Sequence, residues 1–393
     1  MTTTINNEHN KHNVPNLRFP EFQGEWAKCT LNEVCKFHNG RAYKQTELLA
    51  AGKYRVLRVG NFFTNDSWYY SNLELEDNKY AQNGDLLYAW SASFGPRFWR
   101  EEKVIFHYHI WKIDSFKNID KNFLYHFLDL DSAKIKNEVQ GGTMVHITKG
   151  DMEKRTISYP SVPEQRNIAR FLFLLDERIA TQNKIIEDLK KLKSAIIDYA
   201  INSIDADFIK FSSLYEIAGE GGTPTTSNAS FYDNGKIPFI KIDDLKQKYL
   251  TENKDFITEL GLQKSSAWLV PTHSILFSNG ATIGEISITT YPVCTKQGIL
   301  GIVPKQNINV EFLYYFMSSS YFKKAISRIV TEGTMKTAYL KDINNTLCPI
   351  PTKEKQQEIA KMPSALNSKI DLEQSILKLF CSQKQHLLRQ MFI

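Results

Sequence analysis

The sequence contains few cysteines and lacks the pairings that hold small domains together. Its five cysteines, at positions 29, 35, 294, 348 and 381, are odd in number and form no CxxC pair. This argues against a disulfide scaffold and a structural zinc site, and it favours a reducing cytoplasm. No run of about 18 apolar residues occurs, so no membrane-spanning helix is expected. The polar segment from Met1 to Asn13 has no apolar stretch of the kind found in signal peptides.

The motifs of a self-contained DNA-modifying enzyme are also missing. An amino-methyltransferase needs an Asn/Asp-Pro-Pro-aromatic loop, and the sequence contains no Pro-Pro pair. Its Gly-rich turn would have to be Gly219–Pro224, which begins like G-x-G-x-x-G but ends on proline. A Walker A loop fails because Ser230 and Ile237 stand where glycine and Ser/Thr are required.

Two weaker patterns keep metal chemistry open. Asp233, Asp244 and Lys246 could form a magnesium-dependent nuclease centre, although solvated charges on a loop explain them as well. His107 and His109 lie on one face of an expected strand, as a metal pair might. Without a third ligand nearby, a surface or base-contacting pair is the favoured interpretation. We therefore expect the chain not to be an enzyme.

What the sequence does contain is an ordinary globular composition. Hydrophobic residues make up 42% and charged residues 23% of the 393 residues, which excludes a wholly disordered or collagen-like chain. This length predicts roughly two to four folding units. The net charge of +6 permits nucleic-acid binding without requiring it.

An internal repeat sets the architecture. Gly142-Thr143-Met144 recurs as Gly333-Thr334-Met335, and this register continues without a gap to Ile393. Upstream the register shifts slightly but the similarity persists, as when Phe123-Leu124-Tyr125 recurs as Phe312-Leu313-Tyr314. Chance matches do not hold one register over this length. The chain is therefore a duplication in which each copy takes up about half of the sequence.

The first part of each copy has the pattern of a mixed α+β domain. Short runs of β-branched and aromatic residues, broken by Gly, Asn and Pro, predict strands. Examples of these strands are Tyr54–Val59, Asp85–Trp90, Lys103–Ile113, Ile237–Ile242, Ser274–Ser278 and Gly298–Val303. Asn122–Asn137 and Val310–Ile329 have the character of helices.

The second part of each copy predicts a long helix with a coiled-coil seam. Apolar residues alternate at three- and four-residue steps from Pro163 in the first copy, with polar steps at Gln182 and Lys193. The second copy repeats the pattern, with Glu373 and Lys384 at the matching polar steps. Antiparallel pairing of the two helices is favoured, although two helices that each dock separately on their own domain remain an alternative.

One proline interrupts the second seam. Pro363 occupies the position of Leu172 in the first copy, and a proline inside a helix removes a hydrogen bond and clashes with the preceding turn. We expect a kink or a helix restart there, with Pro363 near the first turn of the long segment.

These patterns predict an α+β fold of two globular domains separated by two long helices that form an antiparallel coiled coil, with an internal pseudo-two-fold repeat. The two globular domains are expected over residues 1–160 and 206–351, and the two long helices over residues 161–205 and 352–393. A symmetric dimer would read a palindrome, whereas two divergent domains in one chain can read two different sequences.

The sequence resembles the specificity subunit of type I restriction–modification systems. Several motifs, in this order and together with the duplication, carry the resemblance over nearly the whole chain. They are Leu17–Phe22 with Trp26, Pro163–Ala169, Gly222-Thr223-Pro224, Phe231-Tyr232, Gly235–Pro238, Ser278–Gly284 and Leu387–Phe392. The sequence departs from the pattern at Pro363, at Asn367 where the first copy has Asp176, and at Gly40-Arg41-Ala42 in place of Gly-Thr-Pro.

The resemblance implies a subunit with two target-recognition domains and no catalytic centre. Its partners would be double-stranded DNA, two methyltransferase subunits and, in the full complex, two restriction subunits, with no membrane association. S-adenosylmethionine, Mg and ATP would be bound by those subunits, and this chain would hold no cofactor. The location would be the cytoplasm. The alternative is a non-catalytic protein-interaction rod that carries two generic, for example lectin-like, binding domains.

The candidate DNA-binding residues lie on four loops in each copy, because base readout needs Arg, Lys, Asn, Gln, Ser or Thr side chains that reach the groove. Ordinary turns use the same residue types, so each loop also has a purely structural explanation. The candidates of the first copy are Arg41, Tyr43, Lys44, Arg58, Asn61, Ser91, Ser93, Arg97, His107, His109, Thr143 and His146. Those of the second copy are Thr223, Thr225, Thr226, Asn228, Lys241, Asn279, Thr282, Lys296, Gln297, Thr334, Lys336 and Thr337.

Overall fold

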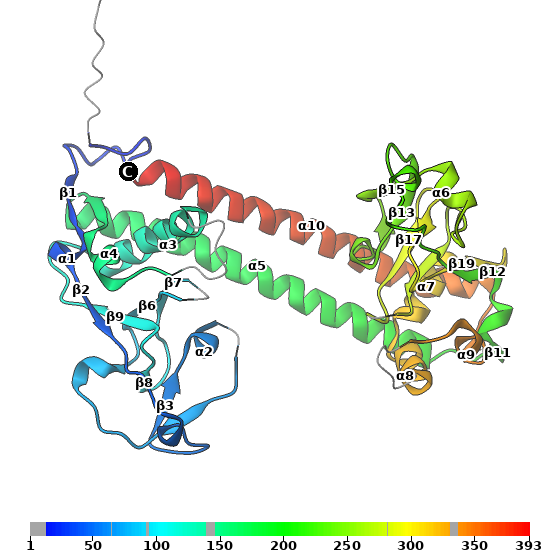
Figure 1. Ribbon diagram of the computed structural model, residues 1–393, viewed down its shortest axis with the longest axis horizontal. Coiled ribbons are helices and arrows are strands. Elements are labelled where there is room, and N and C mark those ends of the chain that lie inside the picture. The colour runs from blue at the N-terminus through cyan, green and yellow to red at the C-terminus, as the bar shows by residue number, and fades with distance from the viewer. Residues whose placement is uncertain (1–12, 64, 92–93, 139–145, 281, 331–336) are drawn as a thin grey trace, which may run out of the picture. The chain divides into compact units, whose positions relative to one another are not determined.

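The computed structural model describes residues 13–63, 65–91, 94–138, 146–280, 282–330 and 337–393. Two compact units are present (Figure 1). Unit 1 comprises Met1–Gln182 and Ile376–Ile393, and unit 2 comprises Asn183–Ser375. The boundary cuts both long helices, α5 (Val162–Asn202) and α10 (Lys353–Met391). The division in space therefore differs from the four consecutive segments expected from the sequence, because each unit combines one globular domain with part of both helices.

Unit 1 contains a four-stranded antiparallel sheet, a second sheet with one parallel pair, and a two-stranded ribbon. Their strand orders are β2-β9-β6-β7, β4-β3-β8-β5 and β1-β10, and β3 and β8 form the parallel pair. The strands are β1 (Ala27–Thr30), β2 (Lys36–Asn39), β3 (Tyr54–Leu57), β4 (Tyr69–Ser71), β5 (Tyr80–Ala81), β6 (Leu86–Ala89), β7 (Gly95–Phe98), β8 (Val104–Phe106), β9 (Ile110–Asp114) and β10 (Thr156–Tyr159). The helices of the domain are α1 (Leu31–Val34), α2 (Val59–Phe63), α3 (Lys121–Glu138) and α4 (Lys149–Lys154), with 3-10 turns η1 (Gln45–Glu47) and η2 (Asp77–Lys79).

Unit 2 repeats this plan with one more strand in its main sheet, where β14 pairs parallel with β17, and one fewer in its second sheet. The strand orders are β12-β19-β16-β17-β14, β15-β13-β18 and β11-β20, and the parallel pair β13–β18 corresponds to β3–β8. The strands are β11 (Phe208–Lys210), β12 (Tyr215–Glu220), β13 (Ile237–Ile240), β14 (Tyr249–Leu250), β15 (Asp255–Ile257), β16 (Ile275–Ser278), β17 (Ile286–Thr289), β18 (Cys294–Thr295), β19 (Ile299–Pro304) and β20 (Leu347–Pro349). The helices are α6 (Glu259–Gln263), α7 (Val310–Ser318), α8 (Ser320–Ile329) and α9 (Leu340–Ile343), with 3-10 turns η3 (Phe211–Ser213), η4 (Ala229–Phe231) and η5 (Ile242–Asp244).

Two predicted elements are each split in the structure. The strand expected over Lys103–Ile113 becomes β8 and β9, because the Ile110 N–H donates to the His107 carbonyl at 2.9 Å and closes a turn between them. The helix expected over Val310–Ile329 becomes α7 and α8. Ser319 breaks it, since the Ser319 hydroxyl accepts a hydrogen bond from the Phe322 N–H at 3.2 Å and caps α8.

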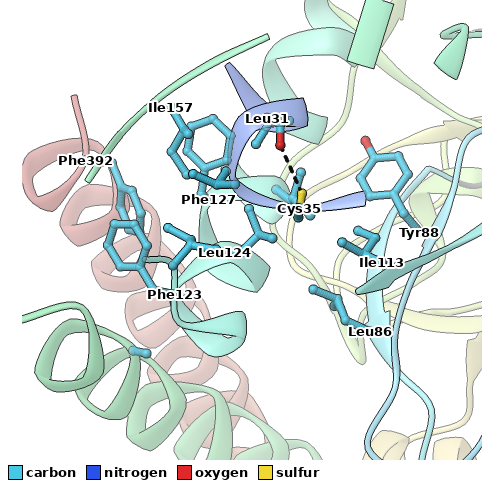
Figure 2. Packing of buried hydrophobic residues seen from close by; sticks show 14 of the residues in the cluster. Leu31, Cys35, Leu86, Tyr88, Ile113, Phe123, Leu124, Phe127, Ile157 and Phe392 are labelled. Atoms are coloured by element: carbon cyan, nitrogen blue, oxygen red, sulfur yellow. Dashed lines mark hydrogen bonds between the residues drawn. The ribbon is translucent and has the colours of Figure 1, made fainter. Parts of the chain in front are cut away.

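The core of unit 1 joins its domain to both helices. Figure 2 shows aromatic and aliphatic side chains from the sheet, α1 and α3 packed together, with Phe392 beyond the end of α10 among them. The rings of Phe123 and Phe392 stack with centroids 4.9 Å apart. Burial of such large side chains contributes about 1.5–3 kcal/mol each. The C-terminal end of the chain is therefore part of the first domain's core.

The two helices run antiparallel within each unit. In unit 1, Lys384 on α10 contacts Asp176 on α5, and in unit 2, Lys193 on α5 contacts Asn367 on α10. From the first contact to the second, the residue number on α5 rises from 176 to 193, whereas the number on α10 falls from 384 to 367. Antiparallel neighbouring helices give this pattern. The alternative in which each helix docks separately on its own domain is therefore wrong, and the α+β fold with paired long helices is confirmed (Figure 1).

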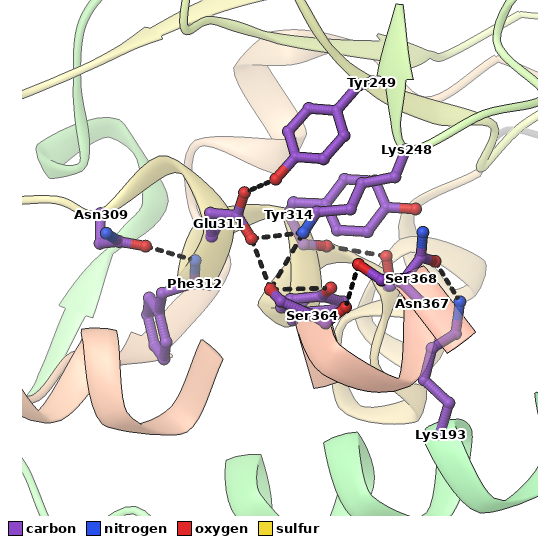
Figure 3. Close-up of polar contacts among 12 residues, drawn as sticks. Lys193, Lys248, Tyr249, Asn309, Glu311, Phe312, Tyr314, Ser364, Asn367 and Ser368 are labelled. Carbon is purple, nitrogen blue, oxygen red and sulfur yellow. Dashed lines mark hydrogen bonds and ion pairs between the residues drawn. The ribbon is translucent and has the colours of Figure 1, made fainter. Parts of the chain in front are cut away.

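The helix α10 does not restart at Pro363, so of the two expected outcomes, a kink or a restart, the restart is wrong. It begins at Lys353 and contains the proline in its interior, where the ring is buried. The next residue, Ser364, belongs to a polar network with Lys248 and Glu311 (Figure 3). The Tyr315 hydroxyl also donates to the Ser364 hydroxyl, at 3.1 Å. Lys248 donates to Ser364 at 3.0 Å and also pairs with Glu311 on α7. These contacts anchor the helix to its domain, so tertiary packing offsets the lost backbone hydrogen bond.

A buried glutamine at the start of each long helix joins that helix to its domain. Gln165, which is fully buried, donates to the carbonyls of Pro160 at 2.8 Å and Asn118 at 2.9 Å, and accepts from the Asp120 N–H at 2.7 Å. Gln356, its counterpart in the second copy, makes the equivalent three bonds to Pro351, Asn307 and Asn309. The repeat therefore preserves a hydrogen-bonded joint as well as an apolar pattern.

Candidate nucleic-acid interface

The same backbone hydrogen bonds occur in both units where corresponding strands end. The His107 N–H donates to the Leu57 carbonyl at 2.9 Å in unit 1, and the Lys296 N–H donates to the Ile240 carbonyl at 2.9 Å in unit 2. His107 and Lys296 are separated by the same offset as Phe123 and Phe312, so the repeat makes them equivalent.

Two further pairs of bonds extend the match. The Trp90 N–H donates to the His109 carbonyl at 3.1 Å, and the Asn279 N–H donates to the Gly298 carbonyl at 3.0 Å. The residues that these bonds bring together differ between the units in side-chain chemistry. We call this shared set of backbone hydrogen bonds the backbone frame. The frame is the same in both units, whereas the side chains on it differ.

A glycine beside the backbone frame is required in each unit. A Cβ on Gly40 would lie 2.3 Å from the His107 carbonyl oxygen, and one on Gly221 would lie 2.2 Å from the Thr295 carbonyl oxygen. The Gly40 and Gly221 N–H groups bond to the equivalent residues Ile110 and Ile299. Gly40 therefore corresponds to Gly221 and not to Gly222, so the sequence match of Gly40-Arg41-Ala42 to Gly222-Thr223-Pro224 is displaced by one position.

In unit 1 the frame gathers an aromatic and basic surface, which we name cluster 1. Trp90 lies with its ring centroid 5.0 Å from that of His109 and 6.1 Å from that of His146. The His107 ring stacks on Tyr43, and its centroid lies 4.9 Å from that of His109. Cluster 1 comprises Arg41, Tyr43, Arg58, Trp90, Ser91, His107, Tyr108, His109 and His146.

The environment of cluster 1 lowers the pKa of two of its histidines, His107 and His109, and so favours their neutral form. Burial, followed by the electrostatic interactions with His109 and Arg58, lowers the pKa of His107 to about 4. Burial and the nearby His146 lower the pKa of His109. A neutral imidazole offers one N–H donor and one nitrogen acceptor, which suits hydrogen bonding to base edges.

The arginines of cluster 1 have different environments. Arg41 donates to Glu47 at 2.8 Å and lies over the Tyr43 ring, and this hydrogen bond raises the pKa of Arg41. Arg58 lies over the Tyr69 ring, with 4.3 Å from Cζ to the ring centroid. Both side chains present a flat cation at the edge of the sheet.

In unit 2 the frame gathers a more polar surface, which we name cluster 2. The Gln297 N–H donates to the Thr223 hydroxyl at 3.3 Å, and the Lys296 and Gln297 side chains are exposed. Lys241 follows β13 directly and forms an ion pair with Asp255 at 2.8 Å. Cluster 2 comprises Thr223, Lys296 and Gln297.

Comparison with known proteins identifies the family. A family model described as the type I restriction modification DNA specificity domain matches residues 23–191 and 204–379. The chain belongs to this family of specificity subunits.

Individual relatives match different shares of the chain. The MjaVIII specificity subunit of Methanocaldococcus jannaschii is 24% identical over 405 residues, which cover 93% of this chain and 91% of that protein. The MjaIX specificity subunit of the same organism is 32% identical over 190 residues, 45% of this chain and 43% of that protein. The EcoBI specificity subunit of Escherichia coli is 23% identical, over 86% of this chain and 78% of that protein.

Two solved structures share the fold. The S subunit from M. genitalium has a TM-score of 0.58 and 18% identity, and the match covers 97% of this chain and 99% of that one. A chain from a structure described as the basis of complex assembly and conformational transition of the type I R-M system also has a TM-score of 0.58, with 15% identity over 92% of this chain and 96% of that one.

Several predicted site residues of this specificity subunit have structural partners outside the two clusters. Asn61 donates to the carbonyls of Asn65 at 2.9 Å and Ser67 at 2.7 Å and closes a turn after α2. Arg97 is exposed on β7 and lies over the Phe63 ring at 5.0 Å. Lys44 is exposed at the start of η1.

The remaining candidates of unit 2 are more scattered. Asn279 is 1% exposed and donates to the Ala338 carbonyl at 3.2 Å, so its side chain supports the loop beside Thr337. Asn228 caps η4, and Thr225, Thr226 and Thr282 are exposed on loops. Ser93, Thr143, Thr334 and Lys336 lie outside the described residues.

The sequence-based candidates omitted Trp90 and Tyr108. Trp90 aligns with Asn279 in the register that also aligns Phe123 with Phe312, so a search for divergent pairs at equivalent positions could have found it. Aromatic side chains suit this surface because they stack on bases or contact thymine methyl groups.

Neither metal pattern gathers a ligand set. In the described part of the chain no three His, Cys, Asp or Glu side chains come together as metal ligands. Asp244 instead accepts a hydrogen bond from the Lys241 N–H at 2.8 Å within η5.

Among the described helices, none combines the length and apolar character needed to cross a membrane.

Proposed function

We propose that this specificity subunit reads a bipartite, asymmetric DNA target, with cluster 1 on one half-site and cluster 2 on the other. The observation that carries the proposal is the shared backbone frame with divergent side chains. Bonds from His107 and Trp90 in unit 1 recur at Lys296 and Asn279 in unit 2. A duplicated frame positions two readers alike, and different side chains on it select different bases.

The chain would direct partner subunits to this target in the cytoplasm and would have no catalytic centre of its own. Two methyltransferase subunits and, in the full complex, two restriction subunits would supply the chemistry. S-adenosylmethionine, Mg and ATP would belong to those subunits. The family membership and the assembly described for one structural relative support this division of roles.

A methylome tests the proposal. The chain would be co-expressed with its methyltransferase subunit in a host without other adenine methylation, and modified adenines would be mapped by long-read sequencing. The expected result is one motif made of two different half-sites separated by a fixed unspecified spacer. A palindromic motif, or methylation that does not depend on this chain, would contradict the proposal.

A further inference from the structure

Arg58 differs from Arg41 and Arg55 because no acidic side chain among the described residues pairs with it. Arg41 pairs with Glu47 at 2.8 Å, and Arg55 pairs with Glu101 at 3.0 Å. The guanidinium of Arg58 has no hydrogen bond or ion pair to any described residue. Its Nε is shielded from solvent and has no acceptor there.

The Arg58 guanidinium is nevertheless held in place. The residue directly follows β3, and its carbonyl accepts the Phe62 N–H at 3.0 Å, which fixes the backbone at the start of α2. The Tyr69 ring lies under the cation, at 4.3 Å from centroid to Cζ. A partly desolvated cation with a fixed plane makes stronger hydrogen bonds to an incoming acceptor than a freely rotating one in water.

The position equivalent to Arg58 in unit 2 serves as an internal comparison. Leu57 and Ile240 accept the matching frame bonds from His107 and Lys296, so the next residues, Arg58 and Lys241, correspond. Lys241 is paired with Asp255 at 2.8 Å and therefore has a carboxylate partner in the protein itself. One unit thus presents an unpaired planar cation where the other presents a neutralised one.

We propose that Arg58 reads a guanine in the major groove of the half-site bound by unit 1, and that Lys241 makes no equivalent contact. The assignment rests on the proposed function. Guanine is the base that offers two adjacent acceptors, O6 and N7, and the terminal nitrogens of a guanidinium donate to both at once. The carboxylate beside cluster 1, Glu47, is engaged by Arg41, so it is not available to accept from cytosine or adenine amino groups.

A backbone phosphate offers the same acceptor chemistry, and the experiment separates the two sources. The complete methyltransferase complex would be titrated with duplexes that carry its methylome-defined site. Each guanine of the unit 1 half-site would be replaced in turn by 7-deazaguanine, which lacks N7 and keeps its base pairing. The expected result is that one replacement weakens binding by roughly fivefold to a hundredfold, whereas the others change it less than twofold.

Variants then connect that guanine to Arg58. In the Arg58→Ala complex, the same 7-deazaguanine replacement should have an effect under twofold, because the contact is already missing. Arg58→Lys keeps the charge without the planar fork and should relax selection at that base pair while keeping most of the affinity. Lys241→Ala, at the equivalent position, should leave the guanine requirement unchanged.

Three results would overturn the assignment. The first is a unit 1 half-site without guanine. The second is an equal loss of affinity for all duplexes in Arg58→Ala, with the salt dependence reduced by about one phosphate, which indicates a backbone contact. The third is a guanine requirement that persists in Arg58→Ala. A wild-type complex that binds no bipartite site would instead contradict the proposed function and this assignment with it.

Discussion

Lys384 on α10 donates to Asp176 on α5, with 2.7 Å between Nζ and Oδ1. In unit 2, Lys193 on α5 donates to Asn367 on α10 at 2.9 Å. The two lysines stand at equivalent positions of the repeat, as do their two acceptors, so one contact occurs twice with the roles of the helices exchanged. The replacement of Asp176 by Asn367 in the second copy makes one contact ionic and the other neutral. Both units therefore use the same antiparallel register.

Removing the ionic contact should destabilise the protein more than removing the neutral one. Lys384 also pairs with Asp129 at 3.2 Å, and the carboxylates of Asp129 and Asp176 raise its pKa although burial acts in the opposite direction. Lys384→Met would leave two partly buried carboxylates and should lower the free energy of unfolding by about 2–3 kcal/mol, discounted for their solvent exposure. Lys193→Met should cost about 1 kcal/mol. Urea unfolding measures both, with the exposed Lys184→Met as control, and equal losses would contradict the ionic assignment.

The glutamine joint should be essential to stability in both copies. Gln165→Ala would leave the Asp120 N–H and two carbonyls without their partner at a buried site. An unsatisfied buried group costs about 1–3 kcal/mol, so we expect a loss of that size in the free energy of unfolding. Gln356→Ala should behave alike. Gln385→Ala on the exposed face of α10 is the matched control and should change stability by less than about 0.5 kcal/mol.

His126 should make the protein less stable in mild acid. Burial, followed by the charge of Lys384, lowers the pKa of His126 to about 3, whereas an unfolded histidine titrates near 6.5. Below about pH 6.5 the unfolded chain therefore binds a proton that the folded chain does not, and stability falls as pH decreases towards about 3. Between pH 7.5 and pH 5 this one residue should remove about 2 kcal/mol.

The residue found at the equivalent position of the second copy provides a substitution that tests how His126 affects stability in acid. Tyr315 occupies the equivalent position in unit 2, and His126→Tyr replaces the imidazole by an aromatic side chain that stays neutral between pH 5 and pH 7.5. Urea unfolding at both pH values should show that the acid-induced loss of stability is smaller in this variant than in the wild type by about 2 kcal/mol. His386→Gln, on the surface of α10, should keep the wild-type difference. An unchanged pH dependence in His126→Tyr would refute the assignment.

The isolated chain should bind DNA weakly. The net charge is only +6 on 393 residues, and affinity depends on the number of phosphates neutralised. We expect the purified chain to lack tight specific binding and the methyltransferase complex to acquire it. Fluorescence anisotropy with a site-containing and a scrambled duplex measures the difference. Nanomolar, sequence-specific binding by the chain alone would contradict this expectation.

The sequence predicted the repeat and most elements because they follow from periodicity. It could not predict where long elements break. Ser319 ends one helix and starts the next through local capping, and the turn at His107 divides a run that is largely apolar and aromatic. Pro363 shows the reverse effect, since the Ser364 network and core packing keep a helix continuous where local chemistry predicts an interruption.

Part of the candidate site could also be predicted from the sequence. Residue chemistry selected Arg41, His107 and His109 as candidates, and the structure brings these three residues together. Residue type alone does not distinguish an asparagine that closes a turn, such as Asn61, from one that faces a groove. Arg58 has no acidic partner among the residues that the structure describes, and spacing along the chain does not reveal which acids the fold places near it.

The most direct test of the two-reader account is a domain exchange read out by methylome sequencing. Trp26–Tyr159 would be replaced by the corresponding segment of another family member, and the chimera would be co-expressed with the same methyltransferase subunit. The account predicts that one half-site changes while the other half-site stays as in the wild type. A change in both half-sites, or in neither, would contradict it.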